Sequence, residues 1–258
     1  MGMKISVLYL GKMEFPHFRL VDDPDESVMV QSPAMAILIQ HPTLGNVLYD
    51  TGNCPDFQRV YTTEMLHDYP ITECVSIKDA LAAKGLTPGD IDRIILSHLH
   101  FDHAGGLGDF VGTKAIRRVM VSEADLKNAY FSVMTGKGGA YIRSLFDVEG
   151  IQFEAINETT ELAEDLTLFI QNAHTPGVIG MVLKTQNHGT ILTTSDTLYT
   201  QESYDTATPP GGTINRTTDE FFDNLKRIKA MEETYHATLL FGHDYDQIMA
   251  WVEKGWID

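Results

Sequence analysis

The sequence predicts an α/β fold in which β-sheets lie between helix layers in a single domain spanning residues 1–258. Three observations support this prediction. Segments typical of strands and of helices alternate irregularly in both halves of the chain. Apolar residues make up 43% of the 258 residues, enough for a sizeable core, and no run approaches the ~18 apolar residues of a membrane span. No linker, low-complexity tract or repeat of fixed period divides the chain.

The first half of the chain contains three predicted strands, two irregular segments and a helix. The strands occupy residues 4–10, 34–40 and 45–50, and His41-Pro42-Thr43-Leu44 between the last two is typical of a hairpin. Residues 12–32 are rich in Pro, Asp and Glu and predict a long loop or flap, whereas residues 53–75 have no clean period and predict a loop or lid. Ser76 and Asp79 begin a capped helix that ends before Gly85.

The second half continues the alternation. Strands are predicted at residues 93–97 and 119–121, and a helix at residues 122–131. Strand-like runs at residues 151–155, 166–171, 180–184 and 190–194 predict a meander that forms the second half of the sheet. Thr217-Thr218-Asp219-Glu220 is a capping box, followed by the helix stripe Phe221, Leu225, Ile228 and either Met231 or Glu232. A last strand covers residues 237–241.

The charge of the chain excludes several classes of partner. It has 36 acidic and 19 basic residues, and its formal net charge of −17 repels the phosphates of nucleic acids and of anionic lipids. We therefore expect neither nucleic acid nor a membrane surface as a partner. Cys54 and Cys74 are too few to cross-link a fold of this size, and the first residues lack the pattern of a signal peptide, so a reducing cytoplasm is the expected location.

Four potential metal ligands, His98, His100, Asp102 and His103, lie within six residues. Residues two apart in an extended segment point to the same side, so the first two can converge on one ion. The other two follow a turn and face a different direction. Two neighbouring metals satisfy this arrangement more easily than one. Imidazole and carboxylate together suit zinc, with iron, manganese or cobalt as alternatives.

Further candidate ligands follow three other predicted strands. They are His174, Asp196 and His243, each directly behind an apolar run, at the rim of the sheets where sites are built. The remaining histidines have no spacing relation to the cluster, and we assign them to the surface: His17, His41, His67, His188 and His236.

The run His98-Leu99-His100-Phe101-Asp102-His103 resembles the His-x-His-x-Asp-His signature of the metallo-β-lactamase superfamily, and Leu48-Tyr49-Asp50-Thr51-Gly52 and Phe241-Gly242-His243-Asp244 extend the resemblance along nearly the whole chain. It implies a four-layer αββα sandwich. It also implies that His98, His100 and His174 hold one metal, that Asp102, His103 and His243 hold the second, and that Asp196 bridges them.

Within that superfamily the chain most resembles the N-acyl homoserine lactone lactonases, the quorum-quenching enzymes. The resemblance rests on the segment from Ser97 to Gly106, on the spacing Asp196-Thr197-Leu198-Tyr199, and on the motif around His243. It implies that Tyr199 leans toward the substrate carbonyl and ring oxygen. The chain departs from the family where Val178 stands in place of a common second histidine, and this departure leaves the substrate subgroup open.

The implied activity is the opening of a lactone ring by a hydroxide that bridges two divalent metals, with Asp196 or Asp102 moving a proton and Tyr199 donating a hydrogen bond. Asp50 and Asp244 either orient ligand imidazoles or are exposed turn residues. Seven apolar side chains in the irregular segments are candidates for an acyl-chain slot: Met13, Phe15, Phe18, Met29, Phe57, Tyr61 and Met65.

Three alternatives stay open at this point. The substrate is a different lactone, of the γ-butyrolactone or pyridoxolactone type. Alternatively, the chain is a thioesterase of the glyoxalase II type, which shares the ligands, although the basic glutathione-binding cluster of that enzyme is not evident after His243, where only Lys254 is cationic. The third alternative is a non-catalytic metal-binding domain. The resemblance is also compatible with a homodimer.

Overall fold

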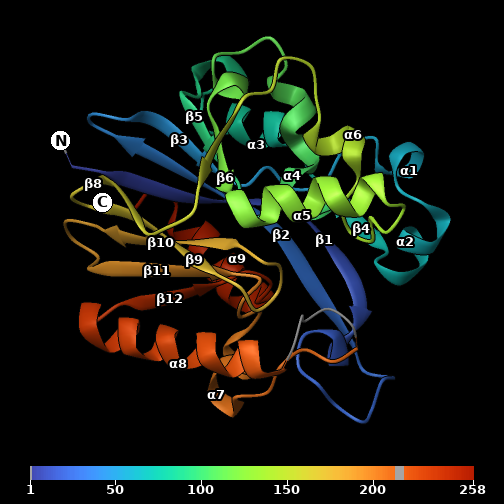
Figure 1. Ribbon diagram of the computed structural model, residues 1–258. Coiled ribbons are helices and arrows are strands. Elements are labelled where there is room, and N and C mark those ends of the chain that lie inside the picture. Colours follow the sequence, from blue (N-terminus) through green and yellow to red (C-terminus); the bar gives the residue numbers. More distant parts are fainter. Residues whose placement is uncertain (1, 213–217) are drawn as a thin grey trace.

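The computed structural model describes residues 2–212 and 218–258, and in it two β-sheets pack face to face (Figure 1). The larger sheet has seven strands in the order β4-β1-β2-β3-β5-β6-β7, and the smaller has five in the order β12-β11-β10-β9-β8. The strands of the larger sheet are β1 (Lys4–Pro16), β2 (Met29–His41), β3 (Gly45–Tyr49), β4 (Ile71–Cys74), β5 (Arg93–Ile95), β6 (Val119–Ser122) and β7 (Phe153–Ile156). Those of the smaller sheet are β8 (Thr160–Ala163), β9 (Leu166–Gln171), β10 (Val178–Lys184), β11 (Thr190–Ser195) and β12 (Thr238–Phe241).

The core between the sheets follows from the alternation of side chains along each strand. Ile5 and Val7 of β1 and Ile37 of β2 pack in one cluster with Met181 of β10 and Leu240 of β12. All five side chains are at most 1% exposed. The facing strands therefore bury their apolar sides against each other, which holds the two sheets together.

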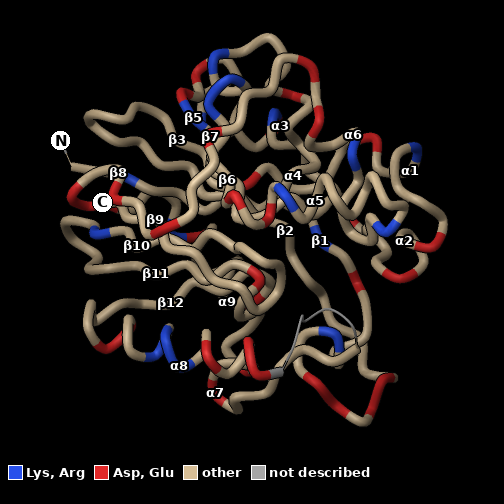
Figure 2. The backbone as a smooth tube through the Cα atoms, in the orientation of Figure 1, with Lys and Arg blue, Asp and Glu red and all other residues tan. Residues whose placement is uncertain are grey.

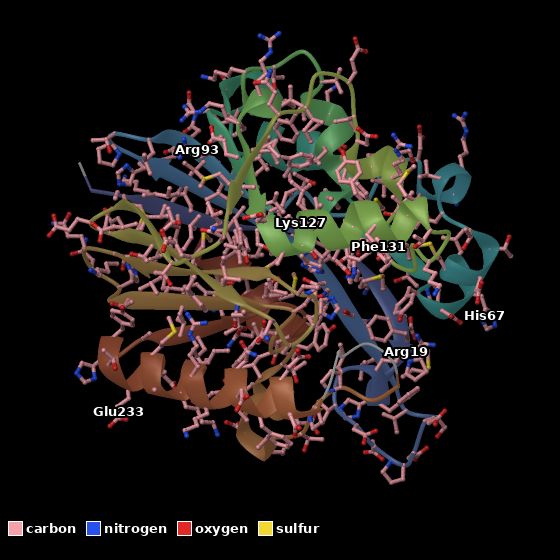
Figure 3. The ribbon with its side chains drawn as sticks, in the orientation of Figure 1. Arg19, His67, Arg93, Lys127, Phe131 and Glu233 are labelled. Carbon is pink, nitrogen blue, oxygen red and sulfur yellow. The ribbon has the colours of Figure 1, made fainter. Side chains whose placement is uncertain are left out.

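Helices cover the outer face of each sheet. On the larger sheet, Leu8 and Leu38 pack against α3 (Ile77–Ala82) and α5 (Glu123–Met134), whereas on the smaller sheet Val182 and Leu192 pack against α8 (Thr218–Tyr235). α9 (Tyr245–Lys254) adds Trp251 to the core between the sheets. The predicted four-layer αββα sandwich is confirmed. Lys127 and Phe131 of α5 and Glu233 of α8 lie on the outer surface (Figure 3).

The remaining helical elements are short. They are η1 (His17–Arg19), α1 (Phe57–Val60), α2 (Thr63–Asp68), η2 (Pro88–Asp90), α4 (Phe101–Ala104), η3 (Gly105–Phe110), η4 (Ala115–Arg117), α6 (Arg143–Phe146) and α7 (Gln201–Thr206). None of the described helices is long and apolar enough to cross a bilayer. Figure 2 shows acidic residues distributed along loops and helices of the chain.

The predicted flap over residues 12–32 is correct only for its central part. β1 continues to Pro16 and β2 begins at Met29, so only residues 17–28 connect them. The register of β1 shifts between Tyr9 and Lys12, where Gly11 has φ 98°. This irregularity interrupts the apolar alternation that marks a strand, which explains why the sequence pattern ended too early.

Residues 53–75 are not one loop either, because they contain α1, α2 and the edge strand β4. The predicted meander is correct for β9, β10 and β11, but β7 pairs in parallel with β6 in the larger sheet. β8, which pairs with β9, was not predicted. The predicted capping box begins at Thr217, outside the described residues. The stripe behind it is present, since Phe221, Leu225 and Ile228 are buried and Met231 packs beside them.

Candidate metal centre

The side chains that the sequence singled out as metal ligands meet at one rim of the two sheets. They are His98, His100, Asp102, His103, His174, Asp196 and His243. The first two follow β5, the next two lie in α4, and the last three follow β9, β11 and β12. All are buried except His100, which is partly buried. Because β3, β5 and β6 are parallel, as are β11 and β12, their carboxyl ends deliver these loops to the same edge.

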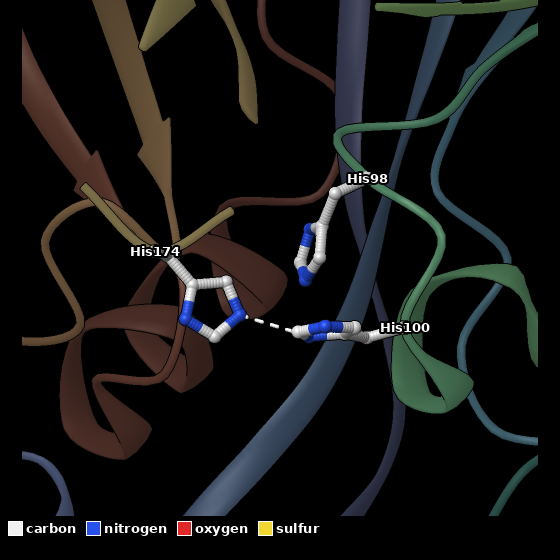
Figure 4. A group of neighbouring side chains, drawn as sticks. All are labelled: His98, His100 and His174. Atoms are coloured by element: carbon white, nitrogen blue, oxygen red, sulfur yellow. Dashed lines mark hydrogen bonds between the residues drawn. The ribbon is translucent and has the colours of Figure 1, made fainter. Parts of the chain in front are cut away.

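The ligand atoms form three overlapping groups, within each of which they lie at most 4.8 Å apart. These groups are His98 with His100 and His174, His98 with His103 and Asp196, and Asp102 with His103 and His243. In Figure 4 the three imidazoles of the first group face one another, with Nε2 of His174 2.9 Å from Nδ1 of His100. The first and third groups share no residue, so the centre offers two adjacent positions for a cation.

Asp196 lies between those two positions. Its Oδ2 is 3.5 Å from Nε2 of His174 and 3.8 Å from Nε2 of His98. Its Oδ1 is 3.2 Å from Nε2 of His103 and 3.3 Å from Nε2 of His243. One carboxylate oxygen therefore approaches the histidines of the first position and the other oxygen approaches those of the second, as a bridging ligand requires.

Hydrogen bonds to the outer ring nitrogens set the tautomers of two histidines. Nδ1 of His103 lies 2.9 Å from Oδ2 of Asp50, and Nδ1 of His243 lies 3.0 Å from the carbonyl oxygen of Pro33. A carboxylate and a carbonyl only accept, so each Nδ1 carries a proton, and Nε2 is the ring nitrogen that is left to bind a cation. Asp50 is held in turn by the backbone N–H of Ser97, which donates to its Oδ1 at 2.7 Å.

The inner nitrogens show that a cation fits. Nε2 of His98 and Nε2 of His103 are buried and have no hydrogen-bond partner among the described residues. A buried nitrogen without a partner costs free energy, and such atoms are rare in folded proteins. A divalent ion would supply the missing partner, and neutral imidazoles with carboxylates are a zinc-type ligand set.

The pKa shifts agree with this chemistry. Burial lowers the pKa values of His98, His100 and His174, which keeps these imidazoles in the neutral form that binds metal. Burial alone would raise the pKa of Asp196, but the neighbouring imidazoles, His103 first, hold it well below its usual range. Burial likewise opposes protonation of His103, yet the surrounding carboxylates, Asp196 first, raise its pKa well above the ordinary value. The centre thus concentrates negative charge that a cation would neutralise.

Unusual backbone conformations occur at the centre. Asp50 has φ 60° and Ser195 has φ 47°, both in the left-handed region that residues other than glycine seldom adopt. Asp50 accepts the hydrogen bond of His103, and Ser195 directly precedes Asp196 in the chain. Gly242 precedes His243 because space is short there: a Cβ atom at this position would lie 3.0 Å from Oδ1 of Asp196.

Tyr199 is buried beside the centre. Its hydroxyl lies 2.8 Å from Nδ1 of His174, and its side chain forms part of the wall of the adjoining cleft. Burial raises the pKa of this phenol well above the ordinary value, so it stays protonated at neutral pH. The resemblance implied that Tyr199 faces the substrate, whereas its contact with the candidate ligand His174 has no signal in the sequence.

Asp125 is a fully buried carboxylate in the helix that the sequence predicts at residues 122–131. Ser122 accepts a hydrogen bond from the backbone N–H of Asp125 at 3.0 Å, as expected at an N-cap. The Asp125 side chain, however, accepts from the backbone N–H of Leu99 at 2.8 Å and from the hydroxyl of Tyr141 at 2.6 Å. Leu99 separates His98 from its partner in the motif, so Asp125 anchors the ligand loop to α5.

A cleft of about 960 Å³ opens onto the metal centre. Of the seven predicted slot residues, Met13, Phe15 and Met65 line it. Phe57 and Tyr61 pack in the cluster behind that wall. The remaining two were predicted wrongly: Phe18 and Met29 do not line the cleft in the described part of the chain, and the latter is 50% exposed.

Two other predictions need correction. Asp244 does not orient a ligand, because its carboxylate accepts from the backbone N–H groups of Gln247 and Gln201 and caps α9. His41 is not at the surface: it is 7% exposed, its Nδ1 accepts from the backbone N–H of Leu44, and its Nε2 lies 2.8 Å from Asp165. These contacts stabilise the hairpin between β2 and β3. His67, in contrast, is exposed as expected (Figure 3).

Several curated proteins are similar to this chain. N-acyl homoserine lactonase AttM of Rhizobium radiobacter is 28% identical over 231 residues, which cover 83% of this chain and 82% of that protein. The AttM protein of Azorhizobium caulinodans is 27% identical over 261 residues, covering 95% and 94%. An N-acyl homoserine lactonase from a Bacillus species is 29% identical over 177 residues, covering 69% and 65%.

Solved structures share the fold. An N-acyl homoserine lactone hydrolase with the product N-hexanoyl-L-homoserine at its catalytic metal center has a TM-score of 0.83 at 23% identity, over 97% of both chains. AidC, a dizinc quorum-quenching lactonase, has a TM-score of 0.69 at 14% identity, over 95% of this chain and 89% of its own. Residues 30–243 match the sequence profile of the Metallo-beta-lactamase superfamily. The chain therefore belongs to the metallo-β-lactamase superfamily.

Proposed function

We propose that this chain is a dinuclear metal-dependent lactone hydrolase that opens N-acyl homoserine lactones and so acts in quorum quenching. One observation carries the proposal: seven ligand-type side chains converge around two adjacent positions, and five of them line a large cleft. The similar curated proteins are named N-acyl homoserine lactonases, and this supports the substrate class.

The proposed ligand sets are His98, His100 and His174 for one ion, Asp102, His103 and His243 for the other, and Asp196 for both; the closeness of these side chains supports the proposal. Zinc is the proposed metal because it favours imidazole and carboxylate, although iron, manganese and cobalt accept the same ligands. When bound, the two ions would bring the pKa of a coordinated water to about 7 and polarise the lactone carbonyl.

Tyr199 would donate a hydrogen bond to the substrate. If Nε2 of His174 uses its lone pair as a ligand, its ring proton is on Nδ1 and is donated to the Tyr199 oxygen. The Tyr199 hydroxyl can then donate its own proton in a hydrogen bond to a group in the cleft. The lactone carbonyl oxygen gains negative charge as the ring carbon becomes tetrahedral, so a fixed donor at this place lowers the barrier.

The two carboxylates at the cleft floor, Asp102 and Asp196, would move the proton. Oδ2 of Asp102 lies 3.7 Å from Nε2 of His103 and 3.8 Å from Nε2 of His243, and no hydrogen bond within the described structure holds it. A carboxylate in this position can accept the proton of the attacking water and return it to the leaving alkoxide.

The charge of the cleft favours a neutral substrate. Its wall includes Glu64 and Asp68 in addition to the two carboxylates at the floor, and none of the described residues that line it is a lysine or an arginine. A glutathione thioester carries carboxylates that such a wall repels. This observation favours a lactone over the thioester substrate of the glyoxalase alternative.

The test is a comparison of substrates with the zinc-loaded protein. We expect N-hexanoyl homoserine lactone to be opened with a kcat/KM at least tenfold above that for γ-butyrolactone, for a pyridoxolactone and for S-lactoylglutathione. A pH-stat detects the acid released from each substrate. Preferred hydrolysis of the thioester would establish the glyoxalase-type alternative, and hydrolysis of none of them would leave a non-catalytic metal-binding domain.

A further inference from the structure

Asn128 is a cleft residue that the proposed mechanism does not use. It lies on α5, is half buried, and lines the cleft together with Tyr141 and His100. The Tyr141 ring packs against the His100 imidazole with 4.4 Å between the ring centroids. The amide side chain of Asn128 donates from Nδ2 to the Tyr141 hydroxyl oxygen at 3.1 Å. Asn128 therefore stands one tyrosine side chain away from a metal ligand.

The hydrogen bonds behind Asn128 fix the orientation of its amide. The Asp125 carboxylate is buried, and burial raises its pKa to about 6, so at neutral pH it is ionised and only accepts. The Tyr141 hydroxyl must then donate to it at 2.6 Å. Since the hydroxyl proton is used, the Tyr141 oxygen accepts from Asn128, and Asn128 must present its NH₂ group rather than its oxygen.

This orientation leaves the Asn128 oxygen as a free acceptor. Oδ1 has no hydrogen-bond partner among the described residues, although the residue lines the cleft. A carbonyl acceptor held on a helix by a buried network is already ordered before a ligand arrives, which reduces the entropy lost on binding. A ligand that offers an N–H donor at this place would complete the chain of hydrogen bonds.

We propose that Oδ1 of Asn128 accepts a hydrogen bond from the amide N–H of an N-acyl lactone and so selects amide-bearing lactones over plain alkyl lactones. This inference rests on the proposed function. In such a substrate the amide is attached to the ring carbon beside the lactone carbonyl. The N–H group of the substrate therefore lies a few bonds from the carbonyl carbon that reacts. Asn128 is similarly near the metal centre, because only the Tyr141 side chain lies between it and His100.

The test compares two substrates, N-hexanoyl homoserine lactone and a γ-alkyl lactone of equal chain length without the amide. The readout is the ratio of their kcat/KM values. Asn128→Leu removes the acceptor while keeping a good helix former of similar size, and we expect the wild-type preference for the amide substrate to fall roughly tenfold, mainly through KM. Tyr141→Phe, which removes the hydroxyl that orients Asn128, should lower the ratio by a smaller factor.

Lys127→Ala is the matched control. Lys127 is the neighbouring residue on α5, exposed and paired with Glu123 outside the cleft (Figure 3), so the preference should stay at the wild-type value. An unchanged preference in Asn128→Leu, or an equal loss on both substrates, would overturn the inference alone. A wild-type protein that opens neither lactone would overturn the proposed function, and this inference with it.

Discussion

At the scale of single residues, hydrogen bonds on the outer side of ligand-type side chains decide which of their atoms face the centre. His103 and His243 turn a proton-bearing nitrogen outward to acceptors, and both face Asp196 with the other nitrogen. Asp50 accepts one of these hydrogen bonds, and its carboxylate also accepts a hydrogen bond from a backbone N–H group. Ligand geometry thus depends on residues that would not touch a metal.

The role of Tyr199 can be tested by removing its hydroxyl. Tyr199→Phe should lower kcat for N-hexanoyl homoserine lactone by roughly 10²-fold, because a donor to the developing oxyanion is lost. The metal content should stay near the wild-type value, since no proposed ligand is removed. Steady-state kinetics and elemental analysis of the same sample check both statements. Turnover at the wild-type rate would remove Tyr199 from the mechanism.

Asp50 and Asp244 form a matched pair for testing the orientation of His103. Asp50→Asn replaces the acceptor of the His103 proton, and we expect metal affinity to fall roughly 10- to 100-fold. Asp244→Asn keeps a good helix cap for α9 and should leave metal affinity unchanged. Competition with a chromogenic chelator measures both affinities. Equal affinities in the two variants would contradict the role of Asp50.

The cluster of candidate metal ligands could be predicted from the sequence because the motif spacing and the position after each strand are local features. The role of Asp125 could not be predicted, since Ser122 and Asp125 form an ordinary helix start in the sequence. The contact of Asp125 with Leu99 spans 26 residues. His41 was misplaced for a related reason. Its bond to Asp165 joins positions 124 residues apart, and no local pattern records it.

At the scale of elements, the strands with clean apolar alternation were predicted and the irregular ones were not. β9, β10 and β11 agree with their patterns, whereas β8 is short and only partly buried, so it carries little apolar signal. α1 and α2 have no fully buried residue, which explains why no helical period was visible between residues 53 and 75. These weakly patterned elements supply Met65 and Tyr69 to the cleft wall.

The attachment of α5 to the ligand loop makes a prediction about pH. Burial raises the pKa of Asp125 from 3.8 to about 6, so the folded protein binds a proton at this carboxyl at a higher pH than the unfolded chain does. Below pH 6 this group therefore adds stability relative to pH 7, and the gain is complete near pH 4. The difference between the two pKa values corresponds to roughly 3 kcal/mol.

Asp125→Asn removes this titration. The unfolding free energy of the wild type minus that of the variant should rise as the pH falls from 7 to 4. Urea unfolding in the presence of a chelator measures this difference without a contribution from bound metal. A difference that does not change with pH would show that Asp125 is not the buried, perturbed carboxylate described above.

At the scale of the whole molecule, the acidic character has two separate parts. Most acidic side chains of the described residues are exposed or partly exposed, and Figure 2 shows these residues spread along the chain. Among the described residues, the buried carboxylates are Asp50, Asp102, Asp125 and Asp196, and all four belong to the metal centre or its supports. The net charge indicated which partners to exclude, but only the fold shows that the buried fraction is gathered at one rim.

Loss of metal should lower the stability of the fold, because the centre joins loops from both sheets. A ligand present at 100 times its Kd stabilises the folded state by about 2.7 kcal/mol, which corresponds to a change in Tm of roughly 5–10 °C for a protein of this size. Calorimetry with and without a chelator measures the change, and added zinc should restore the Tm. An identical Tm after complete removal of metal would contradict this prediction.

In the proposed function, two metals held by these seven side chains open an acyl lactone. The most direct measurement is a zinc titration of the metal-free protein, in which hydrolysis of N-hexanoyl homoserine lactone is followed at each addition. Turnover should rise until two equivalents of zinc per chain are bound and then stay constant. Full activity at one equivalent, or no hydrolysis at two, would contradict it.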